Sequence, residues 1–207
     1  MLQQYHRGSI IFQEGTPIGL IYLLRDGLVK LSVEGPEGKN KTISIVSAAE
    51  SACEILDKRS LGHLVHSCTC EALSPCQLYC LPKATFIWLM KQEFGLTKEV
   101  ILTLSEEVGL LLNKVKNETY FSGRQRLAQL LLRLNKIQAE QKGKHNSIFV
   151  DLSRQELASM IGMARETLTR LLSDLSKQGI IKITADNIFI QKEDQLAMLG
   201  TDMKHQD

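Results

Sequence analysis

The feature that most constrains the fold of this chain is a pair of short helix patterns separated by one glycine. The first pattern begins at Ser153, and Glu156 follows three residues later, which is the arrangement of a capping box. Gly162 ends this pattern, since glycine readily adopts the left-handed conformation found after a helix. The second pattern starts at Met163 and ends before Gly179, with leucines at helical spacing between them. Two short helices joined by so tight a turn predict a helix-turn-helix.

Two short apolar stretches follow the second helix pattern. Residues 180–183 and 188–190 are short runs rich in isoleucine, and Asp186-Asn187 lies between them. This arrangement is typical of a β-hairpin. A hairpin directly after the two helices predicts a winged helix-turn-helix.

Charge is unevenly distributed along the chain, although the net charge is only +2. Residues 121–192 carry 12 lysines and arginines against 6 acids, whereas residues 1–120 carry 12 against 13. A local basic excess is the electrostatic footprint of a nucleic-acid-binding surface. The alternative is an ordinary solvated surface, and charge alone does not separate the two.

The second helix of the pair has one polar face. Its leucines fall on one side, and Arg165, Glu166, Thr169 and Arg170 fall on the other, mostly within the first two turns. In a helix-turn-helix these N-terminal residues of the second helix meet base edges in the major groove. Arginine can bind guanine O6 and N7 together, and glutamate can accept from cytosine N4. An exposed helix charged only for solubility is the alternative, and the capping box, glycine turn and hairpin argue against it.

The first part of the chain has a different pattern. Between Ser9 and Leu81, short apolar runs are broken by turn residues, which favours an all-β sandwich or barrel. The pattern changes after Pro82. Between Phe94 and Val115, apolar residues recur at spacings of three and four without a proline, which predicts a long helix. This stripe either packs on its own β-domain or forms the seam of a parallel homodimer, which we favour. The predicted seam residues are Phe94, Thr97, Ile101, Leu104, Val108, Leu111 and Val115.

Several classes of protein are disfavoured. No apolar run reaches the roughly 18 residues that span a membrane, and no N-terminal pattern indicates a signal peptide. The five cysteines are an odd number, which without a secretion signal favours a reduced, cytoplasmic setting. No nucleophile elbow, P-loop or zinc-protease motif is present, so we do not expect an enzyme.

The order of these segments resembles the catabolite activator / fumarate-nitrate regulator (Crp/Fnr) family, from about Tyr5 to Gln191. The most specific match is to the family's Arg-Glu-Thr-x-x-Arg signature, found at Arg165, Glu166, Thr167 and Arg170. The resemblance implies an α+β fold with three parts: a β-roll of the cyclic-nucleotide-binding type over residues 1–92, a dimerisation helix over 93–121 and a winged helix-turn-helix over 122–207. It implies a homodimeric transcriptional regulator that binds double-stranded DNA and works with RNA polymerase.

The resemblance also assigns roles to residues of the helix-turn-helix. Arg165, Glu166 and Arg170 would read the bases of a TGTGA- or TTGA-like half-site of a palindrome. The residues implied to contact DNA phosphates are Ser153, Arg154, Gln155, Thr167 and Thr169.

The sensor half departs from the family pattern. Members that bind cyclic nucleotide hold its phosphate with a Gly-Glu-Leu stretch and an Arg-Ser pair, because a bare glycine exposes backbone N–H groups and the arginine supplies the counter-charge. Here the two stretches read Cys53-Glu54-Ile55 and His66-Ser67, and the long helix has Leu111 and Leu112 where small hydroxyls would face the purine. We therefore expect no useful affinity for cyclic AMP and no bound cofactor.

The five cysteines leave an alternative open. All lie between Cys53 and Cys80, and Cys68 and Cys70 share a face with His66 on a predicted strand. Such residues could bind a metal or act as a redox switch, which would make the chain a redox- or metal-gated regulator. The spacing is not C-x-x-C, and cysteine is among the most often buried residues. We therefore expect the cysteines to be structural.

Overall fold

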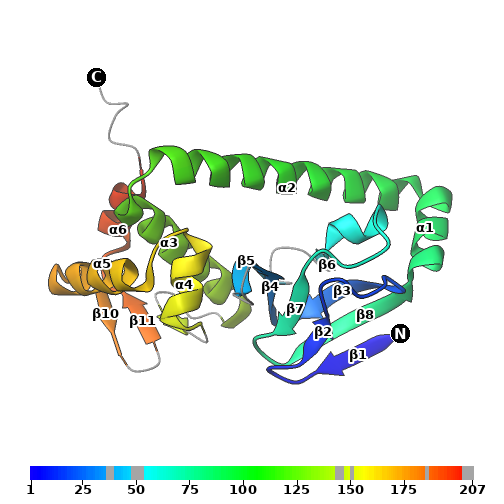
Figure 1. The fold of residues 1–207 in the computed structure, drawn as a ribbon, viewed down its shortest axis with the longest axis horizontal. Coiled ribbons are helices and arrows are strands. Elements are labelled where there is room, and N and C mark those ends of the chain that lie inside the picture. Colours follow the sequence, from blue (N-terminus) through cyan, green and yellow to red (C-terminus); the bar gives the residue numbers. More distant parts are fainter. Residues whose placement is uncertain (36–39, 48–53, 143–146, 150–151, 185–186, 202–207) are drawn as a thin grey trace. The chain divides into compact units, whose positions relative to one another are not determined.

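The computed structural model describes residues 1–35, 40–47, 54–142, 147–149, 152–184 and 187–201. It forms two compact units, Met1–Leu112 and Asn113–Asp207. The boundary falls inside one long helix, α2 (Phe94–Tyr120), which runs through the green part of the ribbon in Figure 1. The candidate effector residue Cys53 and the hairpin residue Asp186 lie outside the described residues.

The first unit contains two four-stranded antiparallel sheets, as the broken apolar runs of the sequence predict. One sheet has the strand order β1-β8-β3-β6, and the other has the order β2-β7-β4-β5. Residues of alternating burial place Leu78 and Cys80 of one sheet and Val29 and Cys70 of the other in a shared core. The strands are β1 (Leu2–Tyr5), β2 (Ile10–Phe12), β3 (Leu20–Asp26), β4 (Leu28–Glu34), β5 (Asn40–Ser47), β6 (Glu54–Leu56), β7 (Thr69–Ala72) and β8 (Cys76–Pro82).

Two helices pack on this roll. Phe86 of α1 (Lys83–Gln92) and Val100 of α2 are buried together with Ile21 of β3. Leu104 of α2 also packs against this cluster, and the hydroxyl of Thr97 donates to the Met90 carbonyl at 2.5 Å.

Two of the predicted seam residues thus have partners within the chain. Leu104 packs on the cluster at the β-roll and Thr97 bonds to α1, while an open apolar stripe lies next to them on α2. The spacings of three and four run through both neighbouring faces of the helix, so they did not show which face meets the roll. Phe94, Ile101 and Val108 remain exposed.

The second unit contains the predicted winged helix-turn-helix. Helices α4 and α5 are the helix pair, and the wing strands β10 and β11 belong to an antiparallel sheet of order β10-β11-β9 (Figure 1). A helix before this motif and a helix after it pack against each other. The elements are α3 (Gly123–Lys142), β9 (Ser147–Phe149), α4 (Arg154–Met160), α5 (Arg165–Lys177), β10 (Ile181–Ile183), β11 (Asn187–Ile190) and α6 (Glu193–Gly200).

Candidate nucleic-acid interface and effector pocket

The first helix of the pair begins with the predicted capping box. The Ser153 hydroxyl accepts from the Glu156 N–H at 3.2 Å, and the Glu156 carboxylate accepts from the Ser153 N–H at 2.8 Å. Two N–H groups that a helix start would leave unpaired are thereby satisfied. The start of α4 is fixed in this way, with the Ser153 and Gln155 side chains exposed.

The second helix presents the predicted polar face. Leu168, Leu172 and Leu175 are buried, which fixes the rotation of α5 about its axis. Arg165 and Glu166, in the first turn, are exposed. Thr169 and Arg170 are exposed too, in the second turn of the helix.

A shallow groove of about 550 Å³ runs along this face of α5. It continues the face toward the helix C-terminus, where sequence reasoning had named no residue. The residues lining it are Arg165, Glu166, Thr169, Arg170, Ser173, Asp174 and Lys177. A signal for the added residues was present in the sequence, because Ser173 and Lys177 follow Thr169 and Arg170 at helical spacing.

The predicted phosphate contact Arg154 is placed differently from its neighbours. It lines a pocket of about 240 Å³ together with Ser173, Ser176 and Lys177 of α5 and Ile183 of β10, among others. Burial lowers the pKa of its guanidinium, and no acceptor in the described part of the chain pairs with its buried Nη1. A half-buried cation with an unpaired N–H is suited to an anion such as a phosphate oxygen.

Thr169 and Thr167 are less available for phosphate contacts than the resemblance implies. The Thr169 hydroxyl donates to the Arg165 carbonyl at 2.9 Å. A hydroxyl has one hydrogen to donate, so Thr169 would have to break this bond to contact a phosphate oxygen. Thr167 is partly buried.

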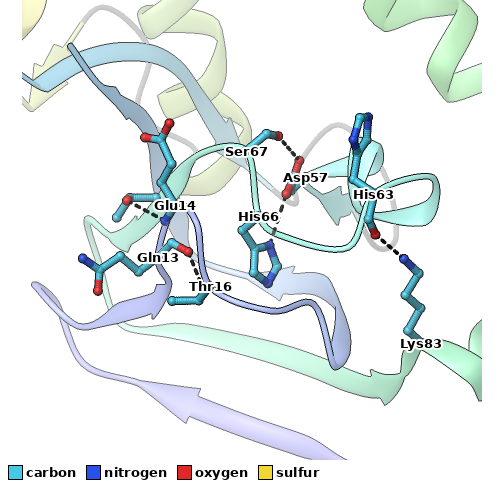
Figure 2. Close-up of polar contacts among 9 residues, drawn as sticks. Gln13, Glu14, Thr16, Asp57, His63, His66, Ser67 and Lys83 are labelled. Atoms are coloured by element: carbon cyan, nitrogen blue, oxygen red, sulfur yellow. Dashed lines mark hydrogen bonds and ion pairs between the residues drawn. The ribbon is translucent and has the colours of Figure 1, made fainter. Parts of the chain in front are cut away.

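The candidate effector pocket holds a buried side-chain cluster, which Figure 2 shows. The His66 Nδ1 lies 3.1 Å from the Asp57 Oδ2, and the Ser67 hydroxyl donates to the Asp57 Oδ1 at 3.2 Å. The His66 ring stacks on Phe12, with ring centroids 4.1 Å apart and planes at 12°. The side chains of His66 and Asp57 are 4% and 1% exposed.

Asp57 is the residue of this cluster that sequence reasoning missed. Its backbone has φ of +49°, which is unusual for a residue other than glycine. A carboxylate at hydrogen-bond distance from His66 and Ser67 opposes any second anion there, because buried like charges repel strongly. The two residues that would have met a nucleotide phosphate therefore meet an internal carboxylate.

The other predicted pocket residues that the structure describes belong to α2 and β6. Leu111 and Leu112 are 56% and 66% exposed on α2, so neither is buried in a pocket of the chain itself. Glu54 begins β6 and pairs with Leu24 in the sheet register.

The described cysteines Cys68, Cys70, Cys76 and Cys80 are all buried in the core of the roll. Burial raises the thiol pKa of Cys70, Cys76 and Cys80, so these groups stay protonated and weakly nucleophilic at neutral pH. Within the described residues, no group of three or more His, Cys, Asp or Glu side chains could hold a metal ion. The proposed ligand set of Cys68, Cys70 and His66 is thus not assembled, and the redox- or metal-gated alternative is not favoured.

We expect these four thiols to resist alkylation in the native protein. Iodoacetamide at pH 7.5 should label Cys68, Cys70, Cys76 and Cys80 far more slowly in buffer than in guanidinium, as measured by mass spectrometry of each cysteine peptide. Because burial raises the pKa of Cys70, Cys76 and Cys80, native labelling of these three thiols should need a higher pH than labelling of an exposed cysteine does. Rapid native labelling at pH 7.5 of any of the four would contradict this assignment.

Among the described helices, none is long and apolar enough to span a membrane.

A winged helix-turn-helix with an exposed charged face on its second helix, in one chain with a β-roll, is typical of DNA-binding transcriptional regulators. Residues 125–199 match the Crp-like helix-turn-helix domain, and residues 2–93 match the cyclic nucleotide-binding domain. The chain belongs to the Crp/Fnr family of transcriptional regulators.

Known proteins of this family align with nearly the whole chain. The CRP-like cAMP-activated global transcriptional regulator of Mycobacterium tuberculosis is 22% identical and covers 93% of this chain and 85% of its own length. The fumarate and nitrate reduction regulatory protein of Escherichia coli K12 is 22% identical, and the alignment covers 94% of this chain and 76% of that protein's length. The solved structure of FixK2 from Bradyrhizobium japonicum has a TM-score of 0.81 at 16% identity and covers 98% of both chains. The relatives from Mycobacterium tuberculosis and Escherichia coli are both described as regulators.

Proposed function

We propose that this protein is a cytoplasmic homodimer that binds a palindromic TGTGA- or TTGA-like DNA site, acts with RNA polymerase and needs no cyclic AMP. The observation that carries the DNA part is the exposed face of α5 with Arg165, Glu166 and Arg170. Half-buried Arg154 and exposed Lys177 add positive charge beside this face. Phosphate contacts from such residues fix the position of a protein on DNA, while the base contacts select the sequence.

The homodimer is supported by the open apolar stripe of α2. Phe94, Ile101, Val108 and Val115 are seven residues apart, and Leu112 lies on the same stripe. Their exposed fractions range from 56% to 78%, and a contiguous apolar stripe of this kind marks an interaction site. A repeat of seven is the spacing with which two parallel helices pair. Paired in this way, two recognition helices would reach half-sites about one helical turn, roughly 34 Å, apart.

Independence from cyclic AMP is supported by the His66–Asp57 pair. In the family pattern an arginine at the position of His66 holds the nucleotide phosphate. Here the histidine is stacked on Phe12 and paired with a carboxylate that would repel a phosphate. A named relative is described as cAMP-activated, and we infer that this chain differs from it in that property.

Fluorescence anisotropy tests the proposal with the full chain and no nucleotide. Reduced protein should bind a TGTGA/TCACA palindrome, or the site recovered by random-site selection, much more tightly than a scrambled duplex. The same affinity after mild oxidation and after adding cyclic AMP is expected. Equal binding to every duplex would refute sequence-specific recognition, and a micromolar cyclic AMP site found by titration calorimetry would refute effector independence.

Arg165→Ala should relax recognition at one base position. We expect a loss of about 1–3 kcal/mol on the preferred duplex and a much smaller loss on a duplex changed at the contacted base pair. Binding of both duplexes is measured side by side, with Arg133→Ala, an exposed arginine of α3, as the control. An equal loss on all duplexes would show that Arg165 contacts phosphate and not a base.

A further inference from the structure

The junction between α2 and α3 is held by two glutamines of α3. Gln125 and Gln129 are four residues apart and therefore lie on the same face of the helix. Both side-chain amides accept one hydrogen bond through their oxygen and donate one through their nitrogen. In each, the amide oxygen accepts from the last turn of α2 or from the turn that follows it, and the amide nitrogen donates to the last residue of α6 or to its C-cap.

Gln125 joins the start of α3 to α6. Its side-chain Oε1 accepts from the Ser122 backbone N–H at 2.8 Å, and its backbone N–H donates to the Ser122 hydroxyl at 3.3 Å. Its Nε2 donates to the Thr201 carbonyl at 3.1 Å. Ser122 is the second of the two residues between α2 and α3, so this contact fixes the turn that joins the two helices.

Gln129 joins α2 to α6 one turn further on. Its Oε1 accepts from Nδ2 of Asn117, in the last turn of α2, at 2.8 Å. Its Nε2 donates to the Gly200 carbonyl at 2.8 Å. The approach is close, because a Cβ on Gly200 would lie 3.3 Å from the Gln129 Cγ.

The two accepting carbonyls are those of Gly200, the last residue of α6, and of Thr201, its C-cap. The last carbonyls of a helix have no partner within it, and here Gln129 provides a partner for that of Gly200. Leu196 of α6 is fully buried, so the helix is anchored and not merely resting on the surface. Gln125 and Gln129, which we call the glutamine clamp, therefore connect the end of α2 to a buried helix of the same unit.

The same end of α3 also contacts the recognition helix. The Arg124 Nη2 donates to Oε1 of Gln178, the C-cap of α5, at 2.5 Å. A Cβ on Gly123 would lie 3.1 Å from the Met163 side chain, in the turn that precedes α5. A change in the angle between α2 and α3 would thus change the direction of α5 relative to the end of α2.

We propose that Gln125 and Gln129 are positioning residues that set the half-site spacing of this regulator, by using α6 to hold the α2–α3 junction at one angle. This inference rests on the proposed function, because spacing matters only when two chains bind one palindrome. Neither glutamine belongs to the candidate base- or phosphate-contacting face. Their role is to limit the geometries in which two recognition helices can dock together.

Glutamate substitutions test the clamp selectively. Gln129→Glu keeps the oxygen that accepts from Asn117 but removes the donor to Gly200, and it places a negative charge at the C-terminal end of α6, which the helix dipole disfavours. Gln125→Glu does the same at Thr201. The matched control is Gln195→Glu, which adds the same charge to an exposed position of α6.

The readout is the ratio of affinities for two duplexes that differ only in spacing. The preferred palindrome is compared with one that has two base pairs inserted between its half-sites, and affinity for a single half-site is measured in parallel. Two base pairs rotate one half-site by about 70° relative to the other, so the unmodified protein should strongly prefer the original spacing. In the double variant Q125E/Q129E, we expect this preference to fall about tenfold, since two hydrogen bonds are lost, with half-site affinity unchanged.

A purely structural role would give a different result. If the variants only destabilise the protein, thermal unfolding will shift and all duplexes will lose affinity equally, so an unchanged spacing ratio overturns the inference. A Gln195→Glu control that relaxes spacing as much as the double variant would also overturn it. Failure of the unmodified protein to bind any palindrome specifically would instead refute the proposed function, which keeps the two failures distinct.

Discussion

Val108→Asp is expected to convert the protein to a monomer and to abolish tight binding to a palindrome. Val108 lies in the middle of the open stripe of α2 and is 56% exposed. In a parallel pair the two introduced carboxylates would face each other across the seam, where desolvation and repulsion both oppose pairing. Losing the linkage between two half-site contacts should lower affinity for the palindrome by about 100-fold or more.

Light scattering after size exclusion measures the mass, and anisotropy measures the binding. Leu110→Asp is the control, because Leu110 is equally exposed but two residues away, on the opposite side of the helix. We expect the control to stay dimeric and to bind normally. A dimeric Val108→Asp protein, or a monomeric control, would show that the seam lies on another face of α2.

Gly27→Ala is expected to cause the largest loss of stability in the β-roll. Gly27 is the residue between β3 and β4 and has φ of +102°. An added Cβ would lie 2.6 Å from both the Cys76 Sγ and the Pro75 carbonyl oxygen. Backbone strain and overpacking each cost about 1–3 kcal/mol, so unfolding by guanidinium should show a loss of about 3–5 kcal/mol.

The control variant Gly15→Ala separates the cost of backbone strain from the cost of steric overlap. Gly15 also has a positive φ, of +78°, but no atom lies within 4 Å of a Cβ added there. Gly15→Ala should therefore cost only the strain, about 1–3 kcal/mol. Equal losses for the two variants would show that the contact with Cys76 and Pro75 is relieved at little cost.

The helix-turn-helix is the part of the fold that sequence reasoning described best. The capping box at Ser153 and Glu156 is present in the structure, and α5 begins at Arg165, two residues after the predicted start. These features depend on contacts within a few residues of chain, so the local sequence is sufficient to specify them. Helices α1 and α6 were not predicted, because each is short and is positioned by packing on distant strands or on α3.

Some features of the candidate sites could likewise be predicted from the local sequence, while others depended on tertiary packing. The polar face of α5 follows from a regular helix with leucines on one side, so it could be predicted residue by residue. The apolar stripe of α2 could be predicted, but only the tertiary structure showed that Leu104 packs at the β-roll and that Thr97 bonds to α1. Cys68 and Cys70 could be placed on one strand face, yet whether that face was a metal site or a core depended on which residues lay opposite.

The sequence by itself determined the strand-rich first part of the chain, the helix-turn-helix and the polar residues in the first two turns of its second helix, because these arise from short-range periodicity, capping and turns. Only the tertiary structure decided that Asp57 pairs with His66, and that Gln125 and Gln129 tie α2 to α6. Asp57 and His66 are nine residues apart along the chain, and Gln129 and Gly200 are 71 apart. Such pairs meet because packed strands and helices bring them together, and no local pattern of residue types encodes which distant partner each polar group will find.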